Sequence, residues 1–386
     1  MIGRAAILFC ASLTAQAYSV LSHEAIIDAA WEDSIKPILR ARYPGTPPED
    51  LLKARGFLYG GAIIQDMGYY PFGSHEFSDL THYFRSGDFI VNMLASAQDV
   101  NELAFALGAL AHYAADNEGH PIAVNRSVPL IYPKVRKKFG AVATYEDDKK
   151  DHLRMEFAFD VAEVAEGRYA PESYHDFIGF QVSKPLLERA FQQTYGVKLT
   201  DFSKKVDLAL GTYRWTVSTL IPRMTRAAWD AKKKDIQKNN PGIEKRRFIY
   251  AISRSSFERE WGKTYSRPGF GARFLAFLLK IIPKIGPFSA LSFHPATPET
   301  QKMFQDSFVR TLAVYRSKLN EVRRGEKISL PNTNFDTGGP SKAGTYRLAD
   351  EAVAKLIEKH GTVDPELSRA LTEFGRTPGA PNDAAR

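Results

Sequence analysis

Two pairs of a histidine and an acid, each pair four residues apart, constrain the fold of this chain most. His112 and Asp116 form the first pair, and His152 and Glu156 form the second. Residues at this spacing lie on one face of an α-helix, so each pair can direct an imidazole and a carboxylate at the same point. The two pairs therefore predict helices at both places.

Helical signals dominate the rest of the chain, and no run is typical of a strand. Asp99 can cap a helix whose third residue is Glu102 and which continues to Asp116. We expect an all-α fold, a multi-helix bundle with a helical C-terminal extension. The other predicted helices begin near Thr144, at Ser183, at Thr200, at Thr297 and near Ser341, and the predicted loops cover residues 69–74 and 329–340.

The first 17 residues have the composition of a signal peptide. Arg4 precedes an apolar run over residues 5–13, and Ala15-Gln16-Ala17 provides a cleavage site of small residues. The run is too short to span a bilayer, although a buried N-terminal helix is the alternative. We expect cleavage before Tyr18 and an exported protein, periplasmic or secreted. The only cysteine, Cys10, leaves with this leader, so a metal site must use histidine and carboxylate.

Charge and hydropathy indicate what the protein can contact. The formal net charge of +8 favours anionic surfaces or phosphate-bearing substrates. The segment Phe270–Phe293 is strongly apolar, but charges and prolines interrupt it, which argues against a membrane span. A buried helical hairpin is favoured there over a segment that lies on a lipid surface.

Further candidate ligands surround the two pairs. His120 follows Asp116 by four residues, and Gly119 allows the chain to turn there at the helix end. Together with His152 and Glu156, His120 leaves one position open on a tetrahedral zinc ion. Three more candidates lie upstream. Asp66 follows an apolar helical run and needs a partner or a metal if it is buried. The other two are His82 and His23.

The order of these residues resembles that of the zinc-dependent phospholipase C family and of the related zinc-dependent single-strand nucleases. The resemblance covers roughly residues 18–220 and implies an all-helical protein with three zinc ions. The residues that carry it are, in order, Tyr18, His23, Asp66, His82, His112, Asp116, His120, His152 and Glu156. The sequence departs from the family in having Tyr18 where Trp is usual and a short gap between Asp116 and His120.

The resemblance implies a ligand set for each ion. Asp66, His82 and His112 hold one zinc ion. Asp116 bridges to a second ion, which His23 and the amino nitrogen and carbonyl oxygen of Tyr18 complete. His120, His152 and Glu156 hold the third. His82 is preferred to His75 because its spacing from Asp66 is closer to the family pattern, while His175 and His294 are interpreted as structural or surface residues.

A mechanism follows from this resemblance. Paired zinc ions lower the pKa of a bridging water, whose hydroxide attacks phosphorus, and Asp66 is the carboxylate expected to orient or deprotonate that water. The aromatic residues Tyr69, Tyr70 and Phe72 could line a headgroup pocket or form a rigid packed loop, and both remain open.

The leading hypothesis is a zinc-dependent phosphodiester hydrolase, a phospholipase C that releases diacylglycerol and a phosphorylated headgroup from phospholipid at a membrane surface. A single-strand nuclease, with nucleic acid as substrate, is the first alternative, and a non-catalytic membrane-binding helical module is the second. No obligate protein partner is evident. We expect a catalytic domain over residues 18–240 and a helical region of unknown role over residues 241–386.

Overall fold

The computed structural model describes residues 20–70, 72–165, 181–202, 206–215, 234, 292–360 and 365–375. These residues form helices joined by loops, and within them the only β-type pairing is an isolated bridge between Thr333 and Pro340. The predicted all-α fold is therefore confirmed. The leader, Tyr18, His175, residues 216–229 of the predicted fourth helix and nearly all of Phe270–Phe293 lie outside the described residues.

The described helices occur in the following order along the chain. They are α2 (Val20–Ala30), η1 (Trp31–Ile35), α3 (Lys36–Arg42), α4 (Pro48–Gly61), η2 (Ile64–Tyr69), α5 (His75–Tyr83), α6 (Ser86–Ser96), α7 (Val100–Gly119), η3 (His120–Val124), α8 (Asn125–Ile131), α9 (Pro133–Phe139), α10 (Lys149–Ala165), α12 (Lys184–Tyr195), α13 (Leu199–Phe202), α14 (Val206–Trp215), α19 (Pro298–Arg323), α20 (Arg347–His360) and α21 (Pro365–Phe374). None of the described helices has the length and hydropathy needed to cross a bilayer.

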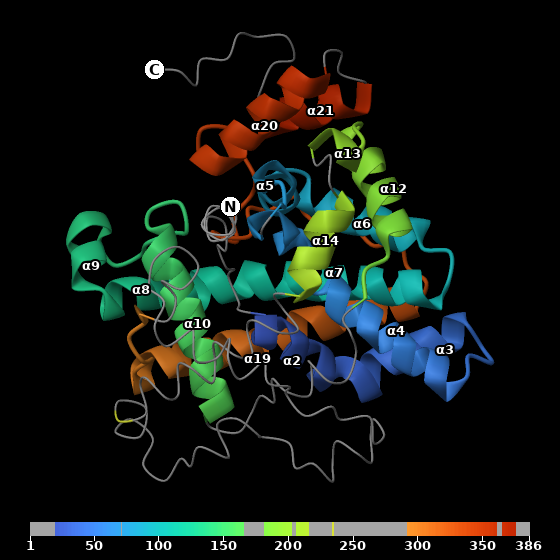
Figure 1. The fold of residues 1–386 in the computed structure, drawn as a ribbon, viewed down its shortest axis with the longest axis horizontal. Coiled ribbons are helices and arrows are strands. Elements are labelled where there is room, and N and C mark those ends of the chain that lie inside the picture. The colour runs from blue at the N-terminus through green and yellow to red at the C-terminus, as the bar shows by residue number, and fades with distance from the viewer. Residues whose placement is uncertain are drawn as a thin grey trace, which may run out of the picture.

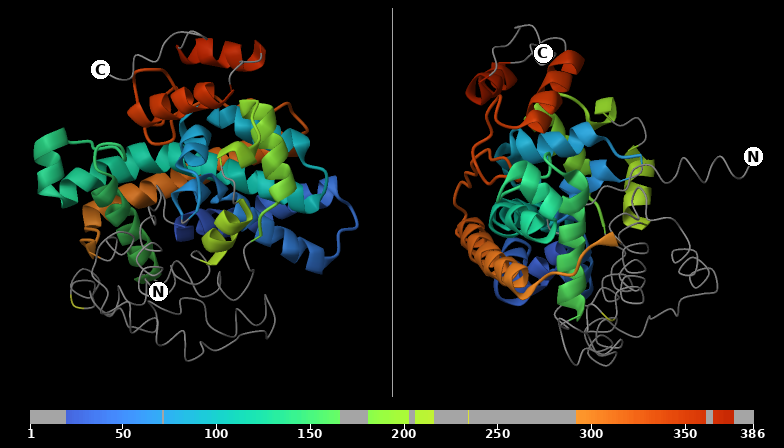
Figure 2. Two further views of the ribbon diagram at one scale, coloured as in Figure 1. Left: turned by 45° about the horizontal axis from the view of Figure 1, so that its top comes forward. Right: turned by 90° about the vertical axis from the view of Figure 1, so that its left-hand side faces the viewer.

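Helix α7 is the centre of the molecule. It runs across the middle of Figure 1, with α2, α4 and α19 on one side and α5 and α6 on the other. Helix α12 packs outside α6, and α20 packs outside α5, so α7 is covered by two layers there (Figures 1 and 2). Almost every side chain of α7 from Leu103 to Asp116 is buried. Polar side chains on this helix are therefore fixed inside the core.

Glycines allow α4 to approach α7 closely. A Cβ atom added at Gly61 would lie 1.9 Å from the carbonyl oxygen of Phe105, and one added at Gly108 would lie 2.1 Å from that of Leu58. Only glycine leaves room for backbones this close. The contact brings the end of α4, at Ala62, against the face of α7 that carries His112.

We expect Gly108→Ala to lower the stability of the protein. The added methyl group forces α4 and α7 apart, and such overpacking costs about 1–3 kcal/mol or more. Urea unfolding followed by circular dichroism measures the change. Gly211→Ala in α14 is the matched control, since its methyl group would meet no described atom within 4 Å. It should be neutral or gain roughly 0.5–1 kcal/mol, and equal losses in both variants would contradict the close-approach argument.

Three predicted helix starts are confirmed, two of them by side-chain caps. The Asp99 carboxylate accepts hydrogen bonds from the backbone N–H groups of Asn101 and Glu102. Thr297 forms a reciprocal capping box with Thr300, and Ser183 precedes α12. These starts were predictable because each cap acts within four residues of chain.

Two predicted starts were wrong by several residues. Helix α10 begins at Lys149 rather than near Thr144, because Thr144 bonds to the Asp147 side chain and Asp148 caps the helix through the N–H of Asp151. Helix α20 begins at Arg347 rather than near Ser341, because residues 342–345 form a turn that contains Gly344 with φ of +77°.

The predicted turn at Gly119 is also wrong. Gly119 has helical dihedral angles of φ −67° and ψ −50°, and the chain continues through the π-helical segment η3 into α8. Pro121 lies in this segment and has no N–H to donate, so a wider turn accommodates it. His120 is therefore held on a continuous helix rather than in a loop.

Candidate metal centre

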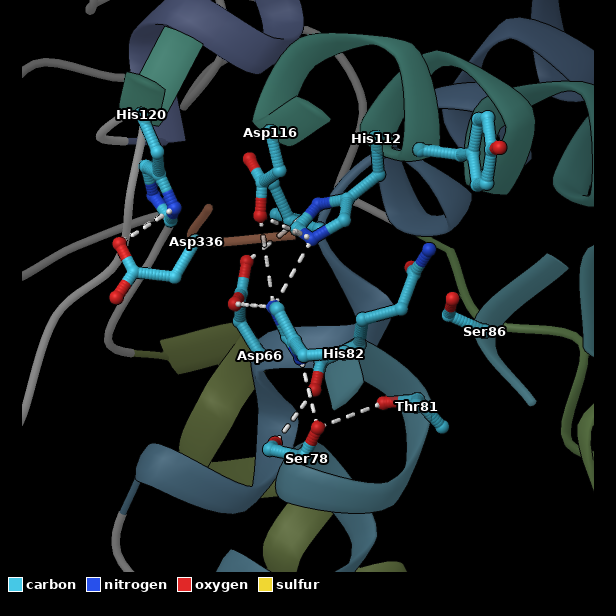
Figure 3. A network of polar contacts seen from close by, with 12 residues as sticks. Asp66, Ser78, Thr81, His82, Ser86, His112, Asp116, His120 and Asp336 are labelled. Atoms are coloured by element: carbon cyan, nitrogen blue, oxygen red, sulfur yellow. Dashed lines mark hydrogen bonds and ion pairs between the residues drawn. The ribbon is translucent and has the colours of Figure 1, made fainter. Parts of the chain in front are cut away.

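Three of the predicted ligands lie on consecutive turns of the central helix. His112 and Asp116 belong to α7, and His120 begins η3. Each step of four residues rotates a side chain by about 40° around a helix, so the three side chains spread across one buried face. Figure 3 shows this face, with His120 directed to one side of Asp116 and His112 to the other.

The first group joins α7 to the segments that precede α6. Asp66 from η2, His82 from α5 and His112 bring one ligand atom each to within 4.8 Å of one another. The Nε2 atom of His82 lies 3.1 Å from Oδ1 of Asp66 and 3.2 Å from Nε2 of His112. All three side chains are buried. The structure thus brings together the three residues that the resemblance assigns to one ion.

Backbone carbonyls orient the two histidines of this group. Nδ1 of His82 lies 2.7 Å from the carbonyl oxygen of Ser78, and Nδ1 of His112 lies 2.9 Å from that of Ala62. A carbonyl oxygen can only accept, so each Nδ1 carries a proton and each Nε2 is the atom left to bind a metal ion. A metal-ligating histidine usually donates its second N–H in this way.

Asp116 lies between the first group and a second one. Its Oδ1 atom is 3.5 Å from Nε2 of His23, while its Oδ2 atom is 3.1 Å from Nε2 of His112 and 3.5 Å from Nε2 of His82. His23, His112 and Asp116 form a separate group with mutual ligand distances under 4.8 Å. The two oxygens of one carboxylate therefore face different histidines, as a carboxylate between two ions must.

The third group contains a residue that the sequence did not single out. His120 and His152 come together with Asp336, from the loop between α19 and α20, and all three are buried. Glu156, the predicted carboxylate, is also buried, and its Oε1 lies 2.8 Å from Nε2 of His152. Asp336 is the only acid between residues 329 and 340. The sequence gives no other signal for it, because it lies 180 residues beyond Glu156.

The three groups have the spacing and donor chemistry that zinc requires. Ligand atoms around a tetrahedral zinc ion, with bonds of about 2.0–2.2 Å, lie about 3.3 Å from one another. The contacts in the first two groups are between 3.1 and 3.6 Å, and Nδ1 of His120 is 3.2 Å from Oδ1 of Asp336. Only histidine nitrogens and carboxylate oxygens are offered, which suits zinc.

Buried polar atoms in these groups lack ordinary partners. Apart from ion-pair contacts within the groups, eleven of these atoms make no hydrogen bond to the described residues. They are both carboxylate oxygens of Asp66, Asp116 and Glu156, both nitrogens of His120 and His152, and Oδ1 of Asp336. Leaving such atoms unsatisfied is costly. Cations between them would remove this cost, so the residues fit zinc.

The protonation equilibria point the same way. Burial raises the pKa of Asp66 and raises that of Glu156 well above its ordinary value, while burial lowers the pKa of His152 to about 3. Against the effect of burial, the Asp116 and Asp66 carboxylates raise the pKa of His82 to about 10. In the protein alone, a proton on His82 thus balances the neighbouring carboxylates of Asp66 and Asp116, and a bound zinc ion would displace it.

The aromatic residues after Asp66 divide into two environments. Tyr69 and Tyr70 are buried: the ring of Tyr69 lies against those of His82 and Tyr145, and Tyr70 packs edge-on against Tyr213. Phe72 is exposed and has a positive φ of 66°. A packed loop therefore describes Tyr70, and of these three residues only Phe72 is exposed.

Two of the histidines set aside from the sequence, His75 and His294, are described and lie outside the groups. His75 is exposed at the start of α5, with its ring 5.7 Å from that of Tyr69, and it is not among the three groups. His294 is exposed and packs against Tyr132. The choice of His82 over His75 thus agrees with where the ligand groups form.

Comparison with known proteins gives one finding. The family model described as zinc-dependent phospholipase C matches residues 22–199. No curated protein and no solved structure matched the chain. The matched residues include eight of the ligand candidates, from His23 to Glu156, and end before the loop that carries Asp336.

Proposed function

The chain belongs, through residues 22–199, to the zinc-dependent phospholipase C family, and on this premise we propose that it hydrolyses membrane phospholipid to diacylglycerol and a phosphorylated headgroup with three zinc ions. It is a hydrolase of phosphodiester bonds. The observation that supports three ions is the position of Asp116, whose two oxygens face His112 and His23 separately, beside a third group around His152.

The zinc ions, when bound, supply positive charge for the phosphoryl oxygens and lower the pKa of a water. The protein holds the ligand side chains in fixed, buried positions. The carbonyls of Ser78 and Ala62 fix two imidazoles, and burial raises the pKa of the neighbouring Asp66 carboxylate, which makes it a better proton acceptor. We propose Asp66 as the residue that orients the attacking water and accepts its proton.

The substrate side of the proposal rests on the edge of the centre. The ring of Tyr69 packs against His82 and also lies near His75 at the exposed start of α5, and Phe72 is exposed three residues further on. An aromatic face at the surface can hold a choline-type headgroup by cation–π attraction. We propose that Phe72 meets the headgroup, whereas the buried Tyr69 and Tyr70 support it from the core.

We further propose that the protein is exported after cleavage before Tyr18. An exported enzyme can reach phospholipid outside the cell. The composition of the leader supports this proposal, with a basic residue, an apolar run and small residues at the cleavage site in that order.

Vesicle hydrolysis tests the proposed function. Zinc-loaded protein that begins at Tyr18, added to phosphatidylcholine vesicles, should release diacylglycerol and phosphocholine, because the attack is on phosphorus with the diacylglycerol oxygen as leaving group. Mass spectrometry of the lipid phase measures the products. Phosphatidic acid would place the cleavage on the other side, and efficient cleavage of single-stranded DNA with inert vesicles would assign the nuclease activity instead. Protein treated with a chelator is the control and should be inactive.

A further inference from the structure

We propose that Asp336 is a ligand of the third zinc ion, together with His120 and His152, so that the C-terminal loop completes the metal centre. The inference rests on the proposed three-zinc site. It concerns a carboxylate more than 130 residues beyond the part of the chain that matches the family.

The position of Asp336 is that of a ligand. Its Oδ1 atom lies 3.2 Å from Nδ1 of His120, and ligand atoms of His120, His152 and Asp336 all lie within 4.8 Å of one another. The side chain is fully buried. Figure 3 shows the carboxylate directed at His120, on the side away from His112.

The two oxygens of Asp336 have different surroundings. Oδ2 accepts hydrogen bonds from the N–H of Tyr145, at 2.8 Å, and from the hydroxyl of Tyr346, at 2.6 Å. Apart from its contact with His120, Oδ1 accepts no hydrogen bond from the described residues. A carboxylate that ligates a metal is usually oriented in this way: hydrogen bonds occupy one oxygen, and the other oxygen faces the imidazoles of the site.

The loop around Asp336 is fixed before any ion binds. Its own N–H donates to Oδ1 of Asn334, and its carbonyl accepts from the side chain of Asn125. The N–H of Phe335 donates to the carbonyl of His82, and the Phe335 ring packs edge-on against that of His82. One loop thus contacts the first group through Phe335 and the third through Asp336.

Zinc content and affinity test the assignment. Full-length Asp336→Asn should stay folded and bind one zinc ion fewer than the unchanged protein, with affinity for that ion lowered at least about 100-fold. Asp88→Asn is the matched control, because Asp88 bonds to Asn332 of the same loop but lies outside the three groups. It should keep every ion. Elemental analysis and competition with a zinc chelator give both quantities.

The outcomes separate this inference from the proposed function. If the protein without any substitution binds no zinc, both the proposed three-zinc site and the ligand role of Asp336 are wrong. Three ions in both the unchanged protein and Asp336→Asn, with affinities within about threefold, would overturn the role of Asp336 alone. If Asp336→Asn does not fold, anomalous scattering at the zinc edge from crystals of the unchanged protein decides the question. A peak within about 2.2 Å of Oδ1 of Asp336 supports the assignment, and a peak bonded only to His120, His152 and Glu156 overturns it.

Discussion

Asp116→Asn should remove the hydrolytic activity more completely than any other single substitution in the centre. The carboxylate faces His112 and His82 with one oxygen and His23 with the other. An amide offers one weakly basic oxygen and an N–H₂ group that repels a cation, so both neighbouring ions lose a ligand. We expect vesicle hydrolysis to fall at least about 1000-fold, equivalent to about 4 kcal/mol in the activation barrier, and zinc content to fall by one to two ions per chain.

The matched control for this substitution is Asp306→Asn. Asp306 is exposed on α19 and, among the described residues, forms an ion pair with Lys302 one turn before it. Such exposed pairs contribute at most about 1 kcal/mol, so activity and zinc content should stay unchanged. Survival of hydrolysis in Asp116→Asn, with zinc content intact, would show that Asp116 does not join the two groups.

The part of the site on the central helix was the most predictable from sequence. His112 and Asp116 are one turn apart on α7, and the local cap at Asp99 fixes where that helix begins. Spacing along a single helix converts directly into a shared face. The same logic holds for His152 and Glu156 on α10, even though the start of α10 was misplaced.

Residues from other segments could be grouped only through the family resemblance. Asp66 and His82 lie in different elements, and what brings them to His112 is the approach of α4 to α7 through glycines and the carbonyl of Ala62. These are contacts across long stretches of chain, and no periodicity in the sequence encodes them. The resemblance supplied the order of the residues, and the fold supplies the distances.

Asp336 shows why the remainder could not be predicted. It lies in a loop without periodic pattern, and it is held by Tyr346 from the end of the same loop and by Tyr145 and Asn125 from two other segments.

The same loop joins the two predicted parts of the chain. The residues from 329 to 341 bond to Ser86, Tyr113 and Asn125 within the predicted catalytic part. The boundary at residue 240 between the catalytic domain and the C-terminal region stays a prediction. What the contacts establish is that this C-terminal loop packs against the metal centre.

The N-terminus is where a single added residue should have the largest effect. Leu21 donates its backbone N–H to the carboxylate of Asp160, at 3.1 Å, and Ser22 donates its hydroxyl to the same carboxylate, at 2.7 Å. Both partners are buried, so the first turn of α2 is fixed against α10 with His23 beside Asp116. Two residues of chain reach at most about 7 Å, so a chain that begins at Tyr18 starts within that reach of Val20 in the anchored turn.

A chain that begins at Tyr18 has a free amine there, whereas a Gly-extended chain has an amide. The amine has an ordinary pKa of about 8 and gives up its proton to zinc, but an amide nitrogen has no lone pair to offer. We expect the Gly-extended protein to fold, to bind one zinc ion fewer, and to hydrolyse vesicles at least about 100-fold more slowly. Tyr18→Trp, which keeps the free amine, is the matched control and should retain both zinc and activity. Equal zinc content and equal hydrolysis with and without the added glycine would show that the amine is not a ligand, and His23 and Asp116 would then have to hold the second ion without it.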